Sequence, residues 1–400
     1  MINRRSFVSA CGAALAAGPG FAQRGPRFDI VIRNGELRDP STSLRRKADL
    51  GIADGKIAAI EDGIPAGQGR DEIDASGLYV TPGLVDLHTH IYHSATGLGI
   101  EADPIAARSG VTTWVDAGSF GHDQTPGFRR FIVNSSQVRI FGYVYLYPSS
   151  RNPDIDPVKY VATVAKRTGE AVEKNRDILI GIKMQVGSNM NGRYSYDFLK
   201  IARQVCDEFR IPLMAHISFA PPETEQVMAL MRAGDVVTHC YNGHSLGIVD
   251  SGGKLKPGVQ EARDRGVLFD IGHGLGSFNF PAAKKALAAG FVCDTISTDI
   301  YGLNVNGPVY DMPTTMTKML HLGMSFDDVL LRSTANPARI IGRVPGLGTI
   351  AVGAPADIAI LALEDGQFTL VDSQRNQEVA RQRIAARVTI CRGRRVVHPA

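Results

Sequence analysis

Two histidines separated by one residue, His88 and His90, directly follow the apolar segment 83–87. On an extended backbone, side chains two positions apart point the same way, so both imidazoles can reach one cation. Three more candidate ligands also end short apolar segments, namely His216, His239 and Asp299. Four histidines and one carboxylate in such positions predict a site of nitrogen and oxygen ligands that suits zinc or a related divalent metal.

Lys183 interrupts another apolar segment, residues 180–184. A lysine in such a segment is unfavourable unless it is paired or modified. One interpretation is that its side chain extends to solvent at the end of a strand. The other is that its deprotonated amine takes up carbon dioxide and becomes a carbamate, an anion that can bridge two cations. The presence of the five other candidate ligands favours the second interpretation.

The middle of the chain, residues 81–345, alternates apolar segments with segments of helical periodicity. The expected strands are 83–87, 112–116, 138–146, 179–184, 213–216, 235–238, 267–271 and 295–297. The expected helices include 158–174, 196–208, 223–231 and 282–289. This alternation favours an α/β fold, a (β/α)8 TIM-like barrel, in which active-site residues gather at the carboxyl ends of the strands. A doubly wound parallel sheet is the alternative.

The two ends of the chain, residues 27–80 and 346–400, have a different pattern of short alternating segments. Turn dipeptides such as Asn34-Gly35 and Asp54-Gly55 separate the segments of the first end. Neither end has enough strands to be stable alone. We therefore expect both ends to build one small β-sandwich beside the barrel domain of residues 81–345.

The first residues have the features of an export signal. Arg4 and Arg5 precede a mildly apolar stretch, residues 10–17, and small residues lie around Ala22. The pattern predicts a twin-arginine-type signal peptide over residues 1–22 and a periplasmic or otherwise exported protein. A disordered start or a short helix is the alternative. A lipoprotein site at Cys11 is disfavoured, because the apolar stretch follows this cysteine instead of preceding it.

Charge and hydropathy exclude two classes of partner. The formal net charge is +4 and no long run of lysine and arginine exists, so we expect no nucleic acid partner. After the signal segment, no stretch reaches the roughly 18 apolar residues that cross a bilayer, so we expect no membrane span. The sequence leaves a homo-oligomer open.

The order of the candidate ligands, His-x-His, Lys, His, His, Asp on the first, fourth, fifth, sixth and eighth expected strands, resembles the amidohydrolase superfamily. The segments that carry this resemblance are Thr81-Pro82-Gly83-Leu84-Val85-Asp86-Leu87-His88-Thr89-His90, Thr334-Ala335-Asn336-Pro337-Ala338 and residues 347–357. The resemblance implies two divalent metals, with zinc as the expected ion. It implies that His88, His90 and Asp299 bind the more buried metal and that His216 and His239 bind the other. A carbamate on Lys183 and a hydroxide would bridge both metals, and Asp299 would be the catalytic acid and base.

A narrower resemblance, carried by residues 234–241, 269–278 and 294–299, is to the deacetylase-type, dihydroorotase-like branch. It implies a small acylated substrate, an N-acyl amino acid or an acyl α-hydroxy acid, whose amide or ester bond is hydrolysed. Ring opening by a cyclic amidohydrolase and a catalytically silent binding protein are the alternatives. The expected substrate contacts are His273, Tyr241, Asn242 and Gln185.

Gln185 departs from the pattern of this branch, in which a basic residue often stands two positions after the bridging lysine. A neutral amide is a poorer partner for a substrate carboxylate than an arginine is. We therefore expect weaker selection for carboxylate-bearing substrates, with Arg193 or Arg151 as substitute partners from the loops.

Overall fold

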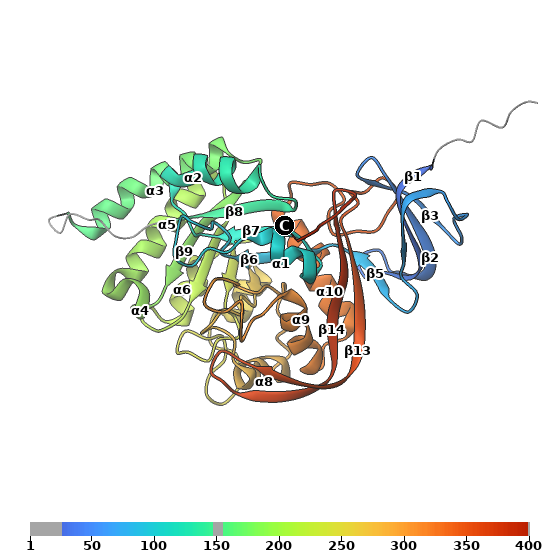
Figure 1. The fold of residues 1–400 in the computed structure, drawn as a ribbon. Coiled ribbons are helices and arrows are strands. Elements are labelled where there is room, and N and C mark those ends of the chain that lie inside the picture. Colours follow the sequence, from blue (N-terminus) through green and yellow to red (C-terminus); the bar gives the residue numbers. More distant parts are fainter. Residues whose placement is uncertain (1–25, 147–154, 399–400) are drawn as a thin grey trace, which may run out of the picture.

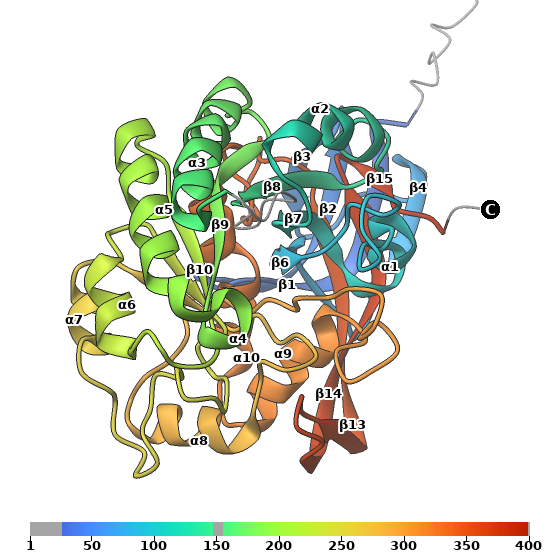
Figure 2. The same ribbon diagram turned by 90° about the vertical axis from the view of Figure 1, so that its left-hand side faces the viewer.

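The computed structural model describes residues 26–146 and 155–398. The expected signal peptide and Arg151 lie outside the described residues. The described chain forms a curled parallel sheet surrounded by helices and, to one side, a second sheet (Figures 1 and 2). No helix among the described residues is long and apolar enough to span a membrane.

The curled sheet contains seven parallel strands in the order β12-β11-β10-β9-β8-β7-β6. Their bounds are β6 Leu84–Thr89, β7 Val111–Ala117, β8 Arg139–Tyr145, β9 Leu179–Val186, β10 Leu213–Ile217, β11 Val236–Thr238 and β12 Leu268–Asp270. Nearly every residue of these strands is buried, as expected for a parallel sheet that is covered on both faces. Seven of the eight expected barrel strands are therefore present.

The eighth expected strand, residues 295–297, is replaced by an irregular segment. This segment makes single bridges on both sides, from Thr295 to Asp270 and from Ile300 to Thr89. It thus lies between β12 and β6 and joins the two edges of the sheet. Asp299 has a φ of 48°, and this left-handed turn interrupts regular pairing. The curled sheet with this connection fits a TIM-like barrel.

Helices connect the strands and cover the outside of the barrel (Figure 2). α3 shows why they form: Asp156 accepts a hydrogen bond from the Lys159 amide at its start, and the buried residues recur at helical spacing. The four expected helices correspond to α3 Pro157–Lys174, α5 Ser195–Phe209, α6 Thr224–Leu230 and α8 Phe280–Ala288. The others are α1 Ala102–Ser109, η1 His122–Gln124, α2 Thr125–Gly127, η2 Phe128–Val133, α4 Ser188–Asn191, η3 Gly192–Tyr194, α7 Val259–Asp264, α9 Met312–His321, α10 Phe326–Ser333 and α11 Ala335–Ile341.

The second sheet is built from both chain ends, in the order β15-β14-β13-β5-β1-β2-β3, with β4 paired to β1. The strands are β1 Phe28–Asp39, β2 Leu44–Ala53, β3 Lys56–Glu61, β4 Gly69–Asp74, β5 Tyr79–Pro82, β13 Ile358–Val371, β14 Gln377–Cys391 and β15 Arg394–Arg395. β5 joins the two ends, because it pairs with β1 on one side and with β13 on the other. Both chain ends contribute strands to this part of the molecule, as the sequence predicted. The strands belong to one hydrogen-bonded sheet, however, and the expected sandwich of two sheets is not confirmed.

The hairpin of β13 and β14 extends beyond this sheet and curves along the barrel (Figure 1). Leu370, Ala380 and Ile384 from its far half belong to the hydrophobic core of the barrel. The Ile384 amide also donates to the hydroxyl of Thr317 in α9 at 3.0 Å. The C-terminal strands thus pack against both parts of the molecule.

Candidate metal-dependent active site

A cavity of about 510 Å³ lies at the carboxyl ends of the barrel strands. Five of the six predicted metal ligands line it: His88, His90, Lys183, His216 and Asp299. His239, the sixth, comes directly after β11, and its ring centroid lies 4.1 Å from that of His216. The fold therefore brings all six predicted ligands, from segments far apart in the sequence, to one end of the barrel.

His88, His90 and Asp299 form the tightest group, with ligand atoms within 4.8 Å of one another. The Oδ1 atom of Asp299 lies 3.3 Å from His88 Nε2 and 3.2 Å from His90 Nε2. Lys183 Nζ lies 3.0 Å from the same His88 nitrogen. Two imidazoles, a carboxylate and an amine that converge in this way have the chemistry of a metal site.

Unsatisfied polar atoms support the same interpretation. His216 Nε2, His239 Nε2 and Asp299 Oδ1 are buried and have no hydrogen-bond partner in the described structure. Buried polar atoms are otherwise nearly always satisfied, and each exception needs a reason. Divalent cations beside these atoms would provide it, so the residues fit the metals that the sequence predicts.

Burial shifts the protonation of the ligands toward the forms that bind metal. Desolvation, followed by the nearby Lys183 charge, lowers the pKa of His88 well below its ordinary value. Desolvation also lowers the pKa of His239 to about 4 and that of His216 well below its usual range. The pKa of Lys183 falls to about 8, again mainly because of burial. Neutral imidazoles are ligands, and a more easily deprotonated amine is the form that can become a carbamate.

A buried hydroxyl network orients His88. Its Nδ1 lies 2.8 Å from the Thr238 hydroxyl, which donates to Asp270 Oδ2 at 2.7 Å. Asp270 also accepts hydrogen bonds from the hydroxyls of Thr295 and Ser297. Because the Thr238 proton is directed at Asp270, Thr238 accepts the Nδ1 proton of His88, and Nε2 is left free as the ligand. Sequence reasoning missed Asp270; its signal is a carboxylate in the apolar segment 267–271.

Two glycines make room for the ligands. A Cβ on Gly272 would lie 2.3 Å from Thr238 Oγ1, and a Cβ on Gly274 would lie 2.4 Å from Asp299 Oδ2. Both glycines also have positive φ, 49° and 56°. The glycines of this loop therefore allow the backbone to approach the candidate metal ligands.

The wall of the cavity is polar but carries few charges. Gln185 lines it as expected, and its Oε1 accepts a hydrogen bond from Tyr145 at 2.8 Å. Tyr301, which the sequence analysis did not single out, also lines the cavity, and burial raises its pKa to about 12. Among the described residues that line the cavity, Lys183 is the single lysine and there is no arginine. Arg193 does not line it; this side chain lies against the ring of Tyr194.

Three expected substrate contacts have other positions. Tyr241 is buried and its hydroxyl donates to the Phe291 carbonyl, while Asn242 is buried and donates to two backbone carbonyls. His273 is fully buried, with Nε2 2.6 Å from Lys318 Nζ and Nδ1 bonded to the Gly274 carbonyl. None of the three lines the described cavity. The geometry thus favours positioning roles behind the wall, because their polar atoms are already satisfied internally.

Comparison with known proteins points to one family. The sequence profile of the Amidohydrolase family matches residues 79–396. A deacetylase of Agrobacterium fabrum is 34% identical over 333 residues, which is 82% of this chain and 81% of the relative. A solved adenine deaminase structure is 33% identical with a TM-score of 0.82, and the match covers 92% of this chain and 99% of the adenine deaminase chain. A solved dihydroorotase structure is 30% identical with a TM-score of 0.80, and the match covers 93% of this chain and 99% of the dihydroorotase chain.

These similarities extend over the barrel and most of the second sheet, well beyond the segment around the histidine pair. The amidohydrolase resemblance predicted from the order of the ligands is therefore confirmed. This chain belongs to the Amidohydrolase family and is a hydrolase.

Proposed function

We propose that the protein hydrolyses an exocyclic amide or ester bond in small acylated molecules, using two divalent metals, with zinc as the expected ion. The observation that carries this proposal is the convergence of six donors that include three unsatisfied buried atoms. His88, His90 and Asp299 would hold one metal, and His216 and His239 the other. A carbamate on Lys183 would join them. The name of the deacetylase relative supports the type of bond.

Bound metals would lower the pKa of water and polarise an acyl carbonyl. The residues of the chain supply the rest. Asp299 lines the cavity, where it can take the proton of the attacking water and pass it to the leaving group. Tyr301 lines the cavity and, like any tyrosine of ordinary or raised pKa, is protonated at neutral pH, so its hydroxyl can donate to a substrate oxygen.

The cavity wall favours substrates without a free carboxylate. Apart from the metal ligands, the described lining offers amides, hydroxyls, the His244 imidazole and the apolar side chains of Leu98, Met190, Phe219 and Leu275. Away from the metal centre, a carboxylate there would lose its hydration without gaining an arginine or lysine partner among the described residues. We therefore expect neutral acyl esters and amides to be better substrates than the corresponding free acids.

Ring opening of a cyclic amide is the second candidate function. The observation that favours it is the similarity to the dihydroorotase structure over 93% of this chain. An exocyclic bond and a ring amide present the same carbonyl to the metals, so the metal site alone does not distinguish them.

A substrate panel tests both candidates with the metal-loaded protein. It contains N-acyl amino acids, acyl α-hydroxy acids, the neutral esters of both, cyclic imides, dihydroorotate and adenine. We expect turnover of the acyclic acyl compounds, with neutral esters above free acids. Turnover confined to the cyclic compounds would replace the deacetylase proposal by the ring-opening one. Turnover of adenine alone would contradict both.

We also propose that the enzyme works outside the cytoplasm, on the basis of Arg4, Arg5 and the apolar stretch that follows them. Cell fractionation with N-terminal sequencing tests this proposal. We expect periplasmic protein that begins shortly after Ala22. Full-length protein confined to the cytoplasm would contradict it.

A further inference from the structure

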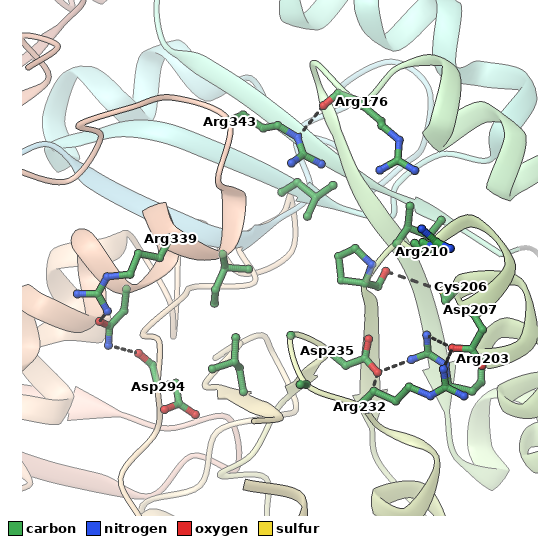
Figure 3. Close-up of a pocket in the computed structure, with 18 residues that line it drawn as sticks. Arg176, Arg203, Cys206, Asp207, Arg210, Arg232, Asp235, Asp294, Arg339 and Arg343 are labelled. Carbon is green, nitrogen blue, oxygen red and sulfur yellow. Dashed lines mark hydrogen bonds and ion pairs between the residues drawn. The ribbon is translucent and has the colours of Figure 1, made fainter. Parts of the chain in front are cut away.

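A second cavity, of about 710 Å³, lies at the opposite end of the barrel from the metal ligands. Figure 3 shows the residues that line it. Its wall includes the first residues of β9 to β12 or the residues just before them, such as Ile180, Pro212, Asp235 and Leu268. The metal ligands stand at the other ends of the same strands. This cavity is therefore separate from the candidate active site, and the proposed hydrolysis does not use it.

Arginine dominates the polar part of the wall. Six arginines line the cavity, together with three aspartates: Arg176, Arg203, Arg210, Arg232, Arg339 and Arg343, with Asp207, Asp235 and Asp294. The aspartates are already paired. Asp207 pairs with Arg203 at 2.7 Å and with Arg232, and Asp235 pairs with Arg203. Asp294 pairs with Arg263, which lies outside the wall.

Four arginines of this wall have no carboxylate partner in the described part of the chain: Arg176, Arg210, Arg339 and Arg343. The hydrogen bonds that they do make are to uncharged oxygens. Arg343 Nε donates to the Arg176 carbonyl at 2.6 Å, and Arg176 donates to the Phe209 carbonyl at 2.8 Å. Figure 3 shows Arg176 and Arg343 near one another along one edge of the cavity. These bonds fix the side chains without neutralising them, so the wall keeps an excess of positive charge.

The buried part of the wall contains an unused donor. The Arg203 side chain is 8% exposed and binds both Asp207 and Asp235, yet its Nε has no hydrogen-bond partner in the described structure. A buried guanidinium nitrogen without an acceptor is unusual. This nitrogen is inaccessible from the cavity and does not itself contact a ligand, so the exposed arginines of the wall are the groups that can bind an anion.

The floor of the cavity is apolar. Ile180, Ile211, Leu268 and Ile340 contribute to it, and Ile180, Leu268 and Ile340 belong to the core cluster at this end of the barrel. The four arginines without a carboxylate partner form a cationic rim around this floor. An apolar floor with a cationic rim suits a ligand that has an apolar body and a strongly anionic group. The planar fork of arginine matches phosphate oxygens in particular. The volume is within the usual range for small-molecule sites.

We propose that this cavity binds a small organic phosphate, with the phosphate on Arg176, Arg210 and Arg343 and the apolar body on the isoleucine and leucine floor. The proposal does not depend on the reaction at the metal centre. Its ligand class follows from two features together: the rim selects the anion and the floor selects the organic portion.

Calorimetric titration of the metal-loaded protein with AMP and with inorganic phosphate, in chloride buffer, tests the proposal. We expect saturable AMP binding that is at least about tenfold tighter than phosphate binding, because only AMP also covers the floor. Arg343→Glu should weaken AMP binding by about tenfold or more, since it places a negative charge beside the phosphate. Arg210→Glu, on another part of the rim, should have the same effect.

Arg167→Glu is the matched control, because Arg167 is exposed on the outer helix α3 and does not line the cavity. It should leave AMP binding unchanged, and all three variants should keep the wild-type kcat/KM for the acyl substrate. Absence of saturable AMP binding would overturn the proposal. So would AMP binding that survives both rim substitutions and competes with the acyl substrate, because that result places AMP at the metal centre. Equal affinity for AMP and phosphate would contradict the claim that the floor binds the organic part of the ligand.

Discussion

Lys318 Nζ lies 2.6 Å from His273 Nε2, in a buried contact between α9 and the loop that follows β12. The same amine donates to the carbonyls of Pro308 and Val371 at 2.8 Å each. His273 in turn bonds to the Gly274 carbonyl, and Gly274 lies against Asp299. A single lysine thus connects the β13–β14 hairpin and two loops to the backbone beside the candidate catalytic carboxylate.

This lysine should make stability depend on pH. Burial lowers the pKa of Lys318 from its ordinary 10.5 to about 7. Between these values the unfolded chain binds a proton that the folded chain lacks, so Lys318 contributes a free energy of unfolding that rises with pH. We expect the free energy of unfolding of the wild type, relative to that of Lys318→Met, to rise by up to about 1.4 kcal/mol per pH unit between pH 7.5 and 9.5. Urea unfolding of both proteins measures this, and a difference that stays flat would contradict it.

Gly274→Ala should disturb the metal site. The new Cβ would lie 2.4 Å from Asp299 Oδ2, and the positive φ of 56° adds strain for any residue with a side chain. We expect loss of metal and of turnover. Gly276→Ala is the matched control, because its Cβ would meet nothing within 4 Å. Metal analysis of both proteins is the measurement, and equal metal content would show that Gly274 is not needed for space.

Thr238→Val should weaken metal binding while preserving shape. Valine cannot accept the His88 Nδ1 proton or donate to Asp270, so the imidazole loses its fixed orientation. Loss of such a supporting hydrogen bond typically costs about 10–100-fold in metal affinity. Chelator competition measures the affinity. Thr238→Ser keeps the hydroxyl and should remain near the wild type; an equal loss in both variants would assign the effect to packing.

Lys183→Ala should lose the carbamate and most of the second metal, because a methyl group cannot replace an anionic ligand. Carbon-13 NMR in labelled bicarbonate should show a carbamate signal in the wild type that is absent from the variant. Lys166→Ala, at an exposed position of α3, controls for loss of a lysine elsewhere. Two tightly bound metals in Lys183→Ala would rule out the bridging role.

Asp299→Asn should reduce turnover far more than substrate binding. Asparagine preserves the shape and one oxygen but cannot take a proton, and loss of a general base typically costs about 10²–10⁴ in rate. Because Asp299 Oδ1 lies among the metal ligands, metal content must be measured in parallel. Near-normal kcat with full metal content would remove Asp299 from the mechanism.

The sequence predicted the six clustered donors because five of them end or follow apolar segments and Lys183 interrupts another, and in a parallel barrel the carboxyl ends of the strands meet at one end. The sequence did not predict the direction of the chain after these donors. His239 has a φ of 71°, so the chain turns sharply there, and Tyr241 and Asn242 pass behind the wall. Local sequence carries no signal for that turn, because a histidine with positive φ is uncommon. Asp270 was missed for a related reason: its partners are hydroxyls from other segments.

The central pairing of the second sheet joins β5, near residue 80, to β13, near residue 360. A ribosome therefore has to synthesise about nine-tenths of the chain before β5 can acquire its second neighbour, so this sheet is completed only at the end of translation. If the protein leaves the cytoplasm by a route that carries folded cargo, this late pairing sets the earliest moment of export. A nascent chain stalled before residue 358 would expose one side of β5, a strand edge open to association with other chains.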